Sequence, residues 1–234
     1  SVMEYLMTLL NSNFEEWRRA NQTAPLDDFP FSTKKMSVSG SLFDMDKLHD
    51  VSKNVISRMS AEDVYDSVAK WSADNDPEFH ELFVRDPEMT KQFLSIGRGG
   101  KKPRKDLALW SETKAYMDFM FDELFQPDYS GMPERAKADA KAILTEYQDV
   151  YDAQDEMTVW FDKVKALAER HGFAPETKLY KKNPEQYKGP VGDISMVLRV
   201  AICGRTNAPD LYSVMQLMPT EKIKARLAAA CEAL

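Results

Sequence analysis

Residues 76–94 read DPEFHELFVRDPEMTKQFL, and this stretch indicates the fold class of the chain. An Asp-Pro pair occurs in it twice, at Asp76-Pro77 and at Asp86-Pro87. A carboxylate just before a helix accepts hydrogen bonds from free backbone N–H groups, and proline fits the first helical position because its missing N–H is not needed there. Each pair therefore predicts the start of a short α-helix.

Similar signals recur on both sides of this stretch. Ser60 with Asp63 resembles the cap of another helix. Apolar residues at helical spacing predict further helices over the ranges 133–147, 155–170, 194–203, 210–217 and 220–233. Strand-like alternation never extends beyond a few residues, and no repeat of solenoid length is evident. The sequence therefore predicts an all-α fold.

The composition is that of an ordinary globular chain. Of 234 residues, 43% are hydrophobic and 29% charged, which argues against a disordered or fibrous protein. No apolar run approaches the roughly 18 to 20 residues of a membrane-spanning helix. Cys203 and Cys231 give no disulfide framework, so we expect a reduced, cytoplasmic compartment. Because the chain opens on Ser1 inside an expected helix, we also expect a piece of a longer polypeptide.

Two segments resemble catalytic signatures without meeting their requirements. Residues 97–102, GRGGKK, are like a phosphate-binding loop, but Lys102 stands where Ser or Thr is needed. Residues 35–39, KMSVS, are like the Lys-Met-Ser-Lys-Ser loop of class I aminoacyl-tRNA synthetases, but Val38 replaces the second lysine. The three histidines lie far apart in the sequence. We therefore expect no catalytic residue and no metal site.

The most informative feature is the basic run 98–105, RGGKKPRK. It holds five positive charges in eight residues, so the rest of the chain carries a net charge of −12 against −7 for the whole. A cationic loop on an acidic body can bind a polyanion without sticking elsewhere. Two interpretations stay open from the residues alone: a nucleic-acid contact, or an ordinary solvated loop.

A second, weaker basic stretch lies between residues 178 and 188. It interleaves lysines with tyrosines, and its members are Lys178, Tyr180, Lys181, Lys182, Tyr187 and Lys188. Aromatic rings among lysines suit unstacked bases, which stack on the rings while ammonium groups meet the backbone. Tyrosines that simply pack into a core are the more common alternative.

Residues 198–212 read LRVAICGRTNAPDLY. This segment resembles the C-terminal signature of bacterial glutamyl-tRNA synthetases, in which a helix of the pattern L-R-V-A-L-T-G and a small turn before P-D-L-Y form part of the anticodon-binding cage. Residues 98–106 with the following Trp110 and Lys114 are similar to a basic insertion of clostridial-type members. Residues 9–20, LLNSNFEEWRRA, resemble the segment just beyond the catalytic domain. The resemblance covers essentially the whole chain.

The resemblance implies an all-α helical cage of two consecutive anticodon-binding domains, over residues 61–125 and 126–234, after a small stem-contact segment over residues 1–60. The nucleotide-binding fold of the family, with its ATP and Mg, would lie before Ser1. It follows that this part alone would show no ligase activity and hold no cofactor. The implied partner is a tRNA specific for glutamate, with glutamine tRNA as a further possibility, and the implied state is a monomer that binds neither membrane nor DNA.

The resemblance also implies roles for individual residues. Arg98 is expected to read a base edge, because its planar fork suits one. In the turn, Arg205, Thr206 and Asn207 are expected to face another anticodon base. The expected phosphate contacts are Lys101, Lys102, Arg104 and Lys105.

Alternatives remain for these assignments. In the alternative interpretation, Gly204 ends one helix and Asn207 or Asp210 begins the next. Cys203 stands where the family usually has Thr, and a thiol is a poorer hydrogen-bonding group. At the level of the whole chain, the rival hypothesis is a helical protein-interaction module whose basic loop is incidental.

Overall fold

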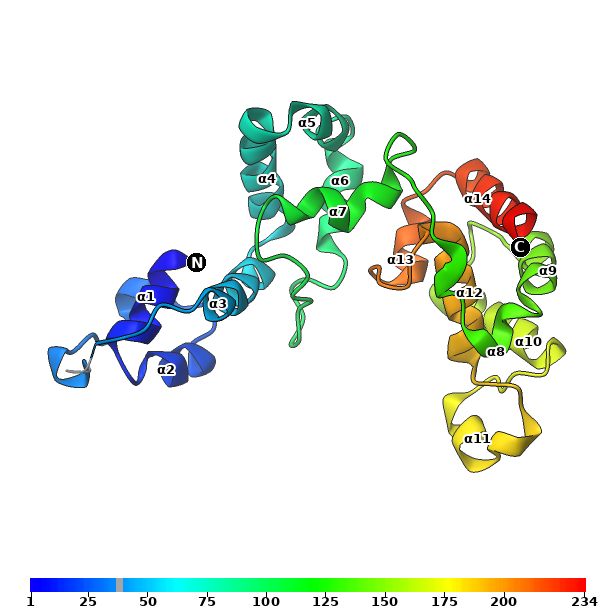
Figure 1. The fold of residues 1–234 in the computed structure, drawn as a ribbon, viewed down its shortest axis with the longest axis horizontal. Helices are drawn as coiled ribbons and strands as arrows, with labels where there is room; N and C mark the ends of the chain where they lie inside the picture. The colour runs from blue at the N-terminus through cyan, green and yellow to red at the C-terminus, as the bar shows by residue number, and fades with distance from the viewer. Residues whose placement is uncertain (37–39) are drawn as a thin grey trace. The chain divides into compact units, whose positions relative to one another are not determined.

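The computed structural model describes residues 1–36 and 40–234 and divides them into two compact units (Figure 1). Unit 1 comprises Ser1–Tyr116 and unit 2 comprises Met117–Leu234. Within the described residues the elements are helices, and the one β-type contact is an isolated bridge between Ala174 and Pro190. The predicted all-α fold is confirmed.

Unit 1 begins with helices that lie around α1 and continues with a cluster around α4. Its helices are α1 (Val2–Leu10), α2 (Phe14–Ala20), α3 (Met45–Arg58), α4 (Ala61–Asn75), α5 (Pro77–Phe83), α6 (Pro87–Ser95) and α7 (Glu112–Met117), the last of which ends in unit 2. Helix α1 contacts α2 and α3, and α4 contacts α5 and α6. The core between α4, α5 and α6 contains Val64, Val68, Phe79, Phe83 and Phe93.

Both Asp-Pro pairs begin helices, as predicted. The Asp76 carboxylate accepts from the N–H of Phe79 at 3.1 Å, and the Asp86 carboxylate accepts from the N–H of Met89 at 3.0 Å. Ser60 likewise accepts from the N–H of Asp63 at the start of α4. Each cap lies beside the helix that it begins, which is why local sequence sufficed to find these starts.

Unit 2 is built around α12. Its helices are α8 (Glu134–Lys137), α9 (Ala140–Val150), α10 (Met157–Arg170), α11 (Thr177–Lys182), α12 (Val191–Cys203), α13 (Leu211–Gln216) and α14 (Thr220–Ala233). Helix α12 contacts α8, α9, α10 and α14, and it is buried along most of its length. This central position explains why its sequence is apolar nearly all round, since a helix covered on several sides needs no polar face.

The contact-based units do not coincide with the expected segments. The expected boundary at residue 60 falls inside unit 1, where the buried Ser52 hydroxyl donates to the carbonyl of Ala108 at 2.6 Å and so ties α3 to the segment before α7. The division into 1–60, 61–125 and 126–234 stays a prediction. In the described part of the chain, no helix is long and apolar enough to cross a membrane.

Candidate nucleic-acid interface

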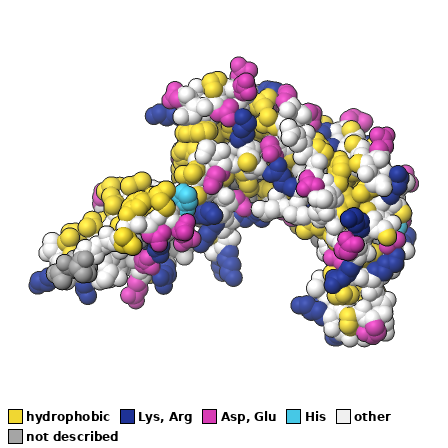
Figure 2. Space-filling model, in the orientation of Figure 1, with side chains coloured by type: hydrophobic (Ala, Val, Ile, Leu, Met, Phe, Trp, Pro, Cys, Tyr) yellow, Lys and Arg dark blue, Asp and Glu magenta, His cyan; other side chains and the backbone are white. Residues whose placement is uncertain are grey.

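The basic run forms a closed loop between α6 and α7. The N–H of Arg104 donates to the carbonyl of Gly97 at 3.0 Å, which closes the base of the loop. Gly97 has a positive φ of 75°, and a Cβ there would come within 2.6 Å of the Arg104 side chain. The positive φ therefore favours glycine at this position. In Figure 1 the loop hangs below α7, and Figure 2 shows dark blue basic atoms at its tip.

Arg98 is turned back into unit 1 rather than out of the loop. Its Nε donates to the carbonyl of Leu94 at 2.7 Å, and its Nη1 donates to the carbonyl of Ile56 at 2.7 Å. These carbonyls lie near the C-terminal ends of α6 and α3, where helix carbonyls lose their usual partners four residues on, and the Ile56 carbonyl also accepts from the N–H of Met59 at 3.2 Å. Burial lowers the pKa of Arg98 from its usual value. The geometry gives Arg98 a structural role, and the prediction that it reads a base stays untested.

Arg104, one of the four expected phosphate contacts, is also engaged. Its Nε and Nη2 donate to the two carboxylate oxygens of Asp106 at 2.7 and 2.8 Å. Such a two-pronged pair fixes the guanidinium in one orientation. The ion pair raises the pKa of Arg104. Within the described structure, Arg104 therefore holds the second half of the loop in place.

The three lysines of the loop remain exposed. Lys101, Lys102 and Lys105 make no hydrogen bond or ion pair with any residue that the structure describes, and all three line a cleft of about 600 Å³ in unit 1. The opposite side of this cleft comes from α1, α2 and α3. An ammonium group without a protein partner is available to a phosphate. The sequence predicted these exposed charges, but not the cleft that they face.

The turn after α12 is fixed at both ends by helix caps. Gly204 has a φ of 67° and ends α12, with its N–H bonded to the carbonyl of Val200 at 2.9 Å. A Cβ on Gly204 would come within 2.7 Å of the Pro127 backbone. Asp210 begins α13 and accepts from the N–H of Ser213 at 2.9 Å. The cap interpretation is therefore correct, with Asp210 rather than Asn207 as the second cap.

The three candidate residues of this turn differ in whether their side chains already contact other protein groups. The Arg205 guanidinium forms an ion pair with Asp118 and lies over the Phe119 ring, 5.3 Å from its centroid. Thr206 and Asn207 are exposed. Both carry short neutral side chains that can exchange hydrogen bonds with a base edge. The turn thus presents hydrogen-bonding groups rather than unpaired charge.

Cys203 is buried at the end of α12. Burial raises the pKa of its thiol to about 11. A neutral buried thiol is a small apolar side chain that cannot touch a ligand at the surface. Cys203 therefore contributes to the packing beneath the turn rather than to its exposed groups.

The second basic stretch includes α11. Tyr180 is half-buried under the guanidinium of Arg135, whose Cζ is 5.7 Å from the ring centroid, and Lys188 forms an ion pair with Asp139 at 2.6 Å. Lys178, Lys181 and Lys182 are exposed. Because Tyr180 already has a cation over its ring, the stretch offers charge more readily than a stacking surface.

The structure lends no support to a catalytic role for either segment that resembles a catalytic signature. Residues 37–39 of the KMSVS segment lie outside the described residues, and Lys35 closes a short 3-10 helix, Thr33–Lys35. No group of three or more His, Cys, Asp or Glu side chains in the described part of the chain is placed to hold a metal ion.

A comparison with known protein families shows to which family the chain belongs. Residues 104–231 match the model of the family described as "anticodon binding domain". The chain belongs to this family. The match begins inside the basic loop, at Arg104, and it includes the capped turn, helices α9 to α13 and α14 up to residue 231.

Curated relatives extend the likeness over nearly the whole chain. The chain is 45% identical to a glutamate–tRNA ligase of Acetivibrio thermocellus, 43% identical to one of Sorangium cellulosum and 41% identical to one of Clostridium perfringens, each over 97% of this chain. It spans only 40–42% of the length of these relatives. The resemblance to glutamyl-tRNA synthetases, clostridial ones among them, is confirmed.

The structure also brings together cations that sequence reasoning left apart. Arg19 and Lys47 line the same cleft as Lys101, although the loop lies more than fifty residues further along the chain. No local pattern marks these two residues, because α2 and α3 are ordinary amphipathic helices with charged outer faces. Only tertiary packing reveals that they share a cleft.

Proposed function

We propose that this chain binds tRNA as the anticodon-binding part of a glutamate–tRNA ligase. The observation that carries the proposal is the match of residues 104–231 to the anticodon binding domain family, and the likeness to three glutamate–tRNA ligases supports it. Anticodon bases are single-stranded and splayed, so side chains can reach their edges while lysines fix the position on phosphates.

The exposed residues divide into two roles. Lys101, Lys102 and Lys105 contact phosphates, because they are exposed ammonium groups without a protein partner. Thr206 and Asn207 meet an anticodon base, and Arg205, held by Asp118, fixes the turn beside them.

Arg98 and Arg104 position the loop rather than contact the RNA. Each guanidinium is used by protein acceptors, Arg98 by backbone carbonyls and Arg104 by Asp106. We therefore propose positioning roles for both, while their expected roles as base reader and phosphate contact stay untested.

In the complete ligase, ATP and Mg belong to a catalytic domain outside the matched part. The 234 residues alone bind tRNA without charging it, as a cytoplasmic monomer without affinity for DNA or membranes. Glutamine tRNA is a second substrate of the binding step where the parent enzyme does not reject it.

Titration with glutamate tRNA at several salt concentrations tests the proposal. Binding should weaken steeply as salt rises, with a slope of roughly 0.7 to 0.9 per phosphate contact, and an anticodon-substituted tRNA should bind more weakly. An aminoacylation assay of the same preparation should be blank. If neither tRNA binds even at low salt, the protein-interaction module with an incidental basic loop becomes the better hypothesis.

A further inference from the structure

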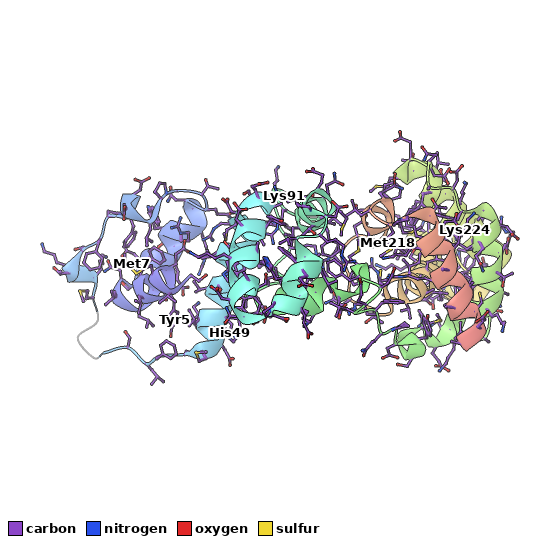
Figure 3. All side chains as sticks on the ribbon, turned by 90° about the horizontal axis from the view of Figure 1, so that it is seen from above. Tyr5, Met7, His49, Lys91, Met218 and Lys224 are labelled. Carbon is purple, nitrogen blue, oxygen red and sulfur yellow. The ribbon has the colours of Figure 1, made fainter. Side chains whose placement is uncertain are left out.

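Arg226 carries a charge into the interior of unit 2. Among the described residues, Arg18 and Arg226 are the buried charged side chains, and the side chain of Arg226 is only 5% exposed. Lys224 on the same helix, labelled in Figure 3 together with Met218 just before α14, is exposed. A charge is costly to remove from water unless protein groups replace the water. The partners of Arg226 therefore indicate what it holds in place.

The Arg226 guanidinium connects three parts of unit 2. Its Nη1 donates to the carbonyl of Ile202 at 2.8 Å, and its Nη2 donates to the Asp122 carboxylate at 3.3 Å. Ile202 lies in the last turn of α12, where a carbonyl loses its usual partner four residues on. The Cζ of Arg226 is also 3.7 Å from the centroid of the Phe125 ring. One side chain on α14 thus holds both the end of α12 and the segment that contains Asp122 and Phe125.

That segment lies directly against the turn after α12. We call residues 118–131 the strap. The N–H of Asp128 in the strap donates to the carbonyl of Gly204 at 2.9 Å. A Cβ on Gly131, at the other end of the strap, would come within 2.7 Å of the Thr206 side chain. The strap therefore supports the backbone of the turn from beneath.

Two arginine–aspartate pairs attach the strap. Arg205 of the turn pairs with Asp118, and Arg226 pairs with Asp122, which also lies 3.0 Å from the Nζ of Lys222 on α14. The Asp122 side chain is 70% exposed, so water weakens its ion pairs. The bond from Arg226 to the end of α12 is buried, and a buried hydrogen bond is electrostatically stronger.

We propose that Arg226 is a positioning residue for anticodon recognition, which holds the end of α12 and the strap so that Thr206 and Asn207 meet a base in one orientation. Arg226 itself does not touch the RNA, because it is buried. Hydrogen bonds between short side chains and a base edge depend on direction, so a small rotation of the supporting backbone weakens them. The inference rests on the proposed function and deepens it by adding a residue outside the turn.

The alternative is that Arg226 stabilises the fold without affecting recognition. Replacing a buried charged group by a well-packed apolar one is often neutral for stability, so an apolar side chain can take over the packing of Arg226. It cannot take over the fixed directions of the guanidinium donors. Because the carbonyl that Arg226 holds lies two residues before Gly204, this directional control acts at the start of the turn.

The first test compares Arg226→Met with Arg18→Met. Arg18 is the matched control, because it is also buried, donates to the carbonyls of Asn21 and Ala24, and pairs with Glu4 in unit 1. Each variant is titrated with glutamate tRNA and with an anticodon-substituted tRNA. Arg226→Met should lower the preference for the normal anticodon about three-fold, whereas Arg18→Met should leave the preference unchanged.

The preference, unlike the affinity, does not respond to a loss of stability alone. A smaller folded fraction lowers the apparent affinity for both tRNAs by the same factor, so their ratio stays constant. Equal preferences in Arg226→Met and in the wild type would therefore overturn the proposal and leave Arg226 a purely structural residue.

The double variant Arg226→Met/Asn207→Ala tests whether Arg226 acts through the turn. If it does, the second substitution should add little to the loss of preference caused by Asn207→Ala alone, because the contact that Arg226 positions is already gone. If the two losses multiply in full, Arg226 acts independently of the turn, and the proposal is wrong.

Hydrogen exchange measures the support of the turn without RNA. Arg226→Met should speed exchange of the amides of Gly204 and Asp128 about ten-fold, since both N–H groups bond within the supported region. Arg18→Met should leave these amides as they are in the wild type. Unchanged exchange in Arg226→Met would show that other contacts hold the turn, which overturns the proposal.

A variant at an exposed residue avoids any loss of folding. Asp122→Ala removes one partner of Arg226 at the surface and should lower the anticodon preference about two-fold. The matched control is Glu62→Ala, which removes an exposed carboxylate 2.6 Å from Lys91 on α6 of unit 1, also labelled in Figure 3. Equal preferences in these two variants would count against a role of the strap in recognition.

These outcomes separate the positioning role from the proposed function. If the wild type prefers the normal anticodon and Arg226→Met keeps that preference, the positioning role alone fails. If the wild type itself shows no preference, anticodon recognition by this chain fails, and faster exchange in Arg226→Met would then describe a structural contact only.

Discussion

The basic loop of unit 1 and the capped turn of unit 2 use their arginines in the same way and their exposed residues differently. In the loop, Arg98 is bound to backbone carbonyls, and in the turn Arg205 is bound to Asp118. The loop then exposes lysines, whereas the turn exposes Thr206 and Asn207.

The difference teaches how affinity and selectivity can be divided between two parts of one chain. An ammonium group is a point charge that meets any phosphate, so we expect the loop to contribute binding that depends on salt but not on sequence. Short neutral donors and acceptors must meet a particular base edge, so we expect the turn to contribute discrimination with little affinity. In both places, the arginine is the group that fixes the backbone.

The largest expected effect contrasts two glycines with nearly the same backbone. Gly204 in the turn and Gly99 in the loop have φ values of 67° and 71°, but only Gly204 has a backbone neighbour within 2.7 Å of a would-be Cβ, at Pro127, while Gly99 has open space. Gly204→Ala should therefore lower the free energy of unfolding by about 3 kcal/mol, and Gly99→Ala by about 1 kcal/mol. Urea unfolding followed by circular dichroism measures both. Equal losses would mean that only the positive φ matters and that the turn is not held against Pro127.

The next effect concerns the charge of the loop. Replacing Lys101, Lys102 and Lys105 together by Gln should weaken binding of glutamate tRNA by about 2 kcal/mol and lower the salt slope by about 2 to 3, because three phosphate contacts are lost. Stability should not change, since these side chains touch no described partner. The matched control replaces Lys178, Lys181 and Lys182 of unit 2 by Gln. An equal loss in the control would show that general charge, rather than the loop, governs binding.

A smaller effect separates positioning from base reading at Arg98. Arg98→Ala leaves the carbonyls of Ile56 and Leu94 without this donor, so the free energy of unfolding should fall by about 1 to 2 kcal/mol. The folded variant should keep its preference for the normal anticodon. If the preference disappears while unfolding is unchanged, Arg98 reads a base after all and the positioning role is wrong.

The sequence predicts the parts of this molecule whose causes are local. Asp76, Asp86 and Gly204 act on backbone groups a few residues away, so their patterns identify helix ends without knowledge of the fold. The five charges of the basic run are equally visible. What the sequence could not reveal is where a guanidinium finds its acceptor.

The features that the sequence could not predict depend on contacts between residues that are far apart in the chain. Arg98 reaches Ile56, 42 positions away in the chain, and this contact exists only because α3 and α6 end near each other. The cleft depends in the same way on α2 and α3 facing the loop. A positive charge in sequence therefore indicates a possible RNA contact, but only packing decides whether the charge is free for RNA or already satisfied by protein.

The smallest expected effect tests whether the turn after α12 contributes selectivity for the anticodon. Asn207→Ala removes an exposed amide at the turn, whose two ends stay fixed by Gly204 and Asp210, so stability and the salt slope should be unchanged. The preference for the normal anticodon over a substituted one should fall by about 1 kcal/mol, the loss of one hydrogen-bonded base contact.

Asn207→Asp keeps the shape of the side chain but removes the amide donor. If Asp discriminates as well as Asn, the contact uses an acceptor oxygen and the base presents a donor. If neither variant changes the preference, the turn does not read the anticodon, and selectivity must come from elsewhere in the chain.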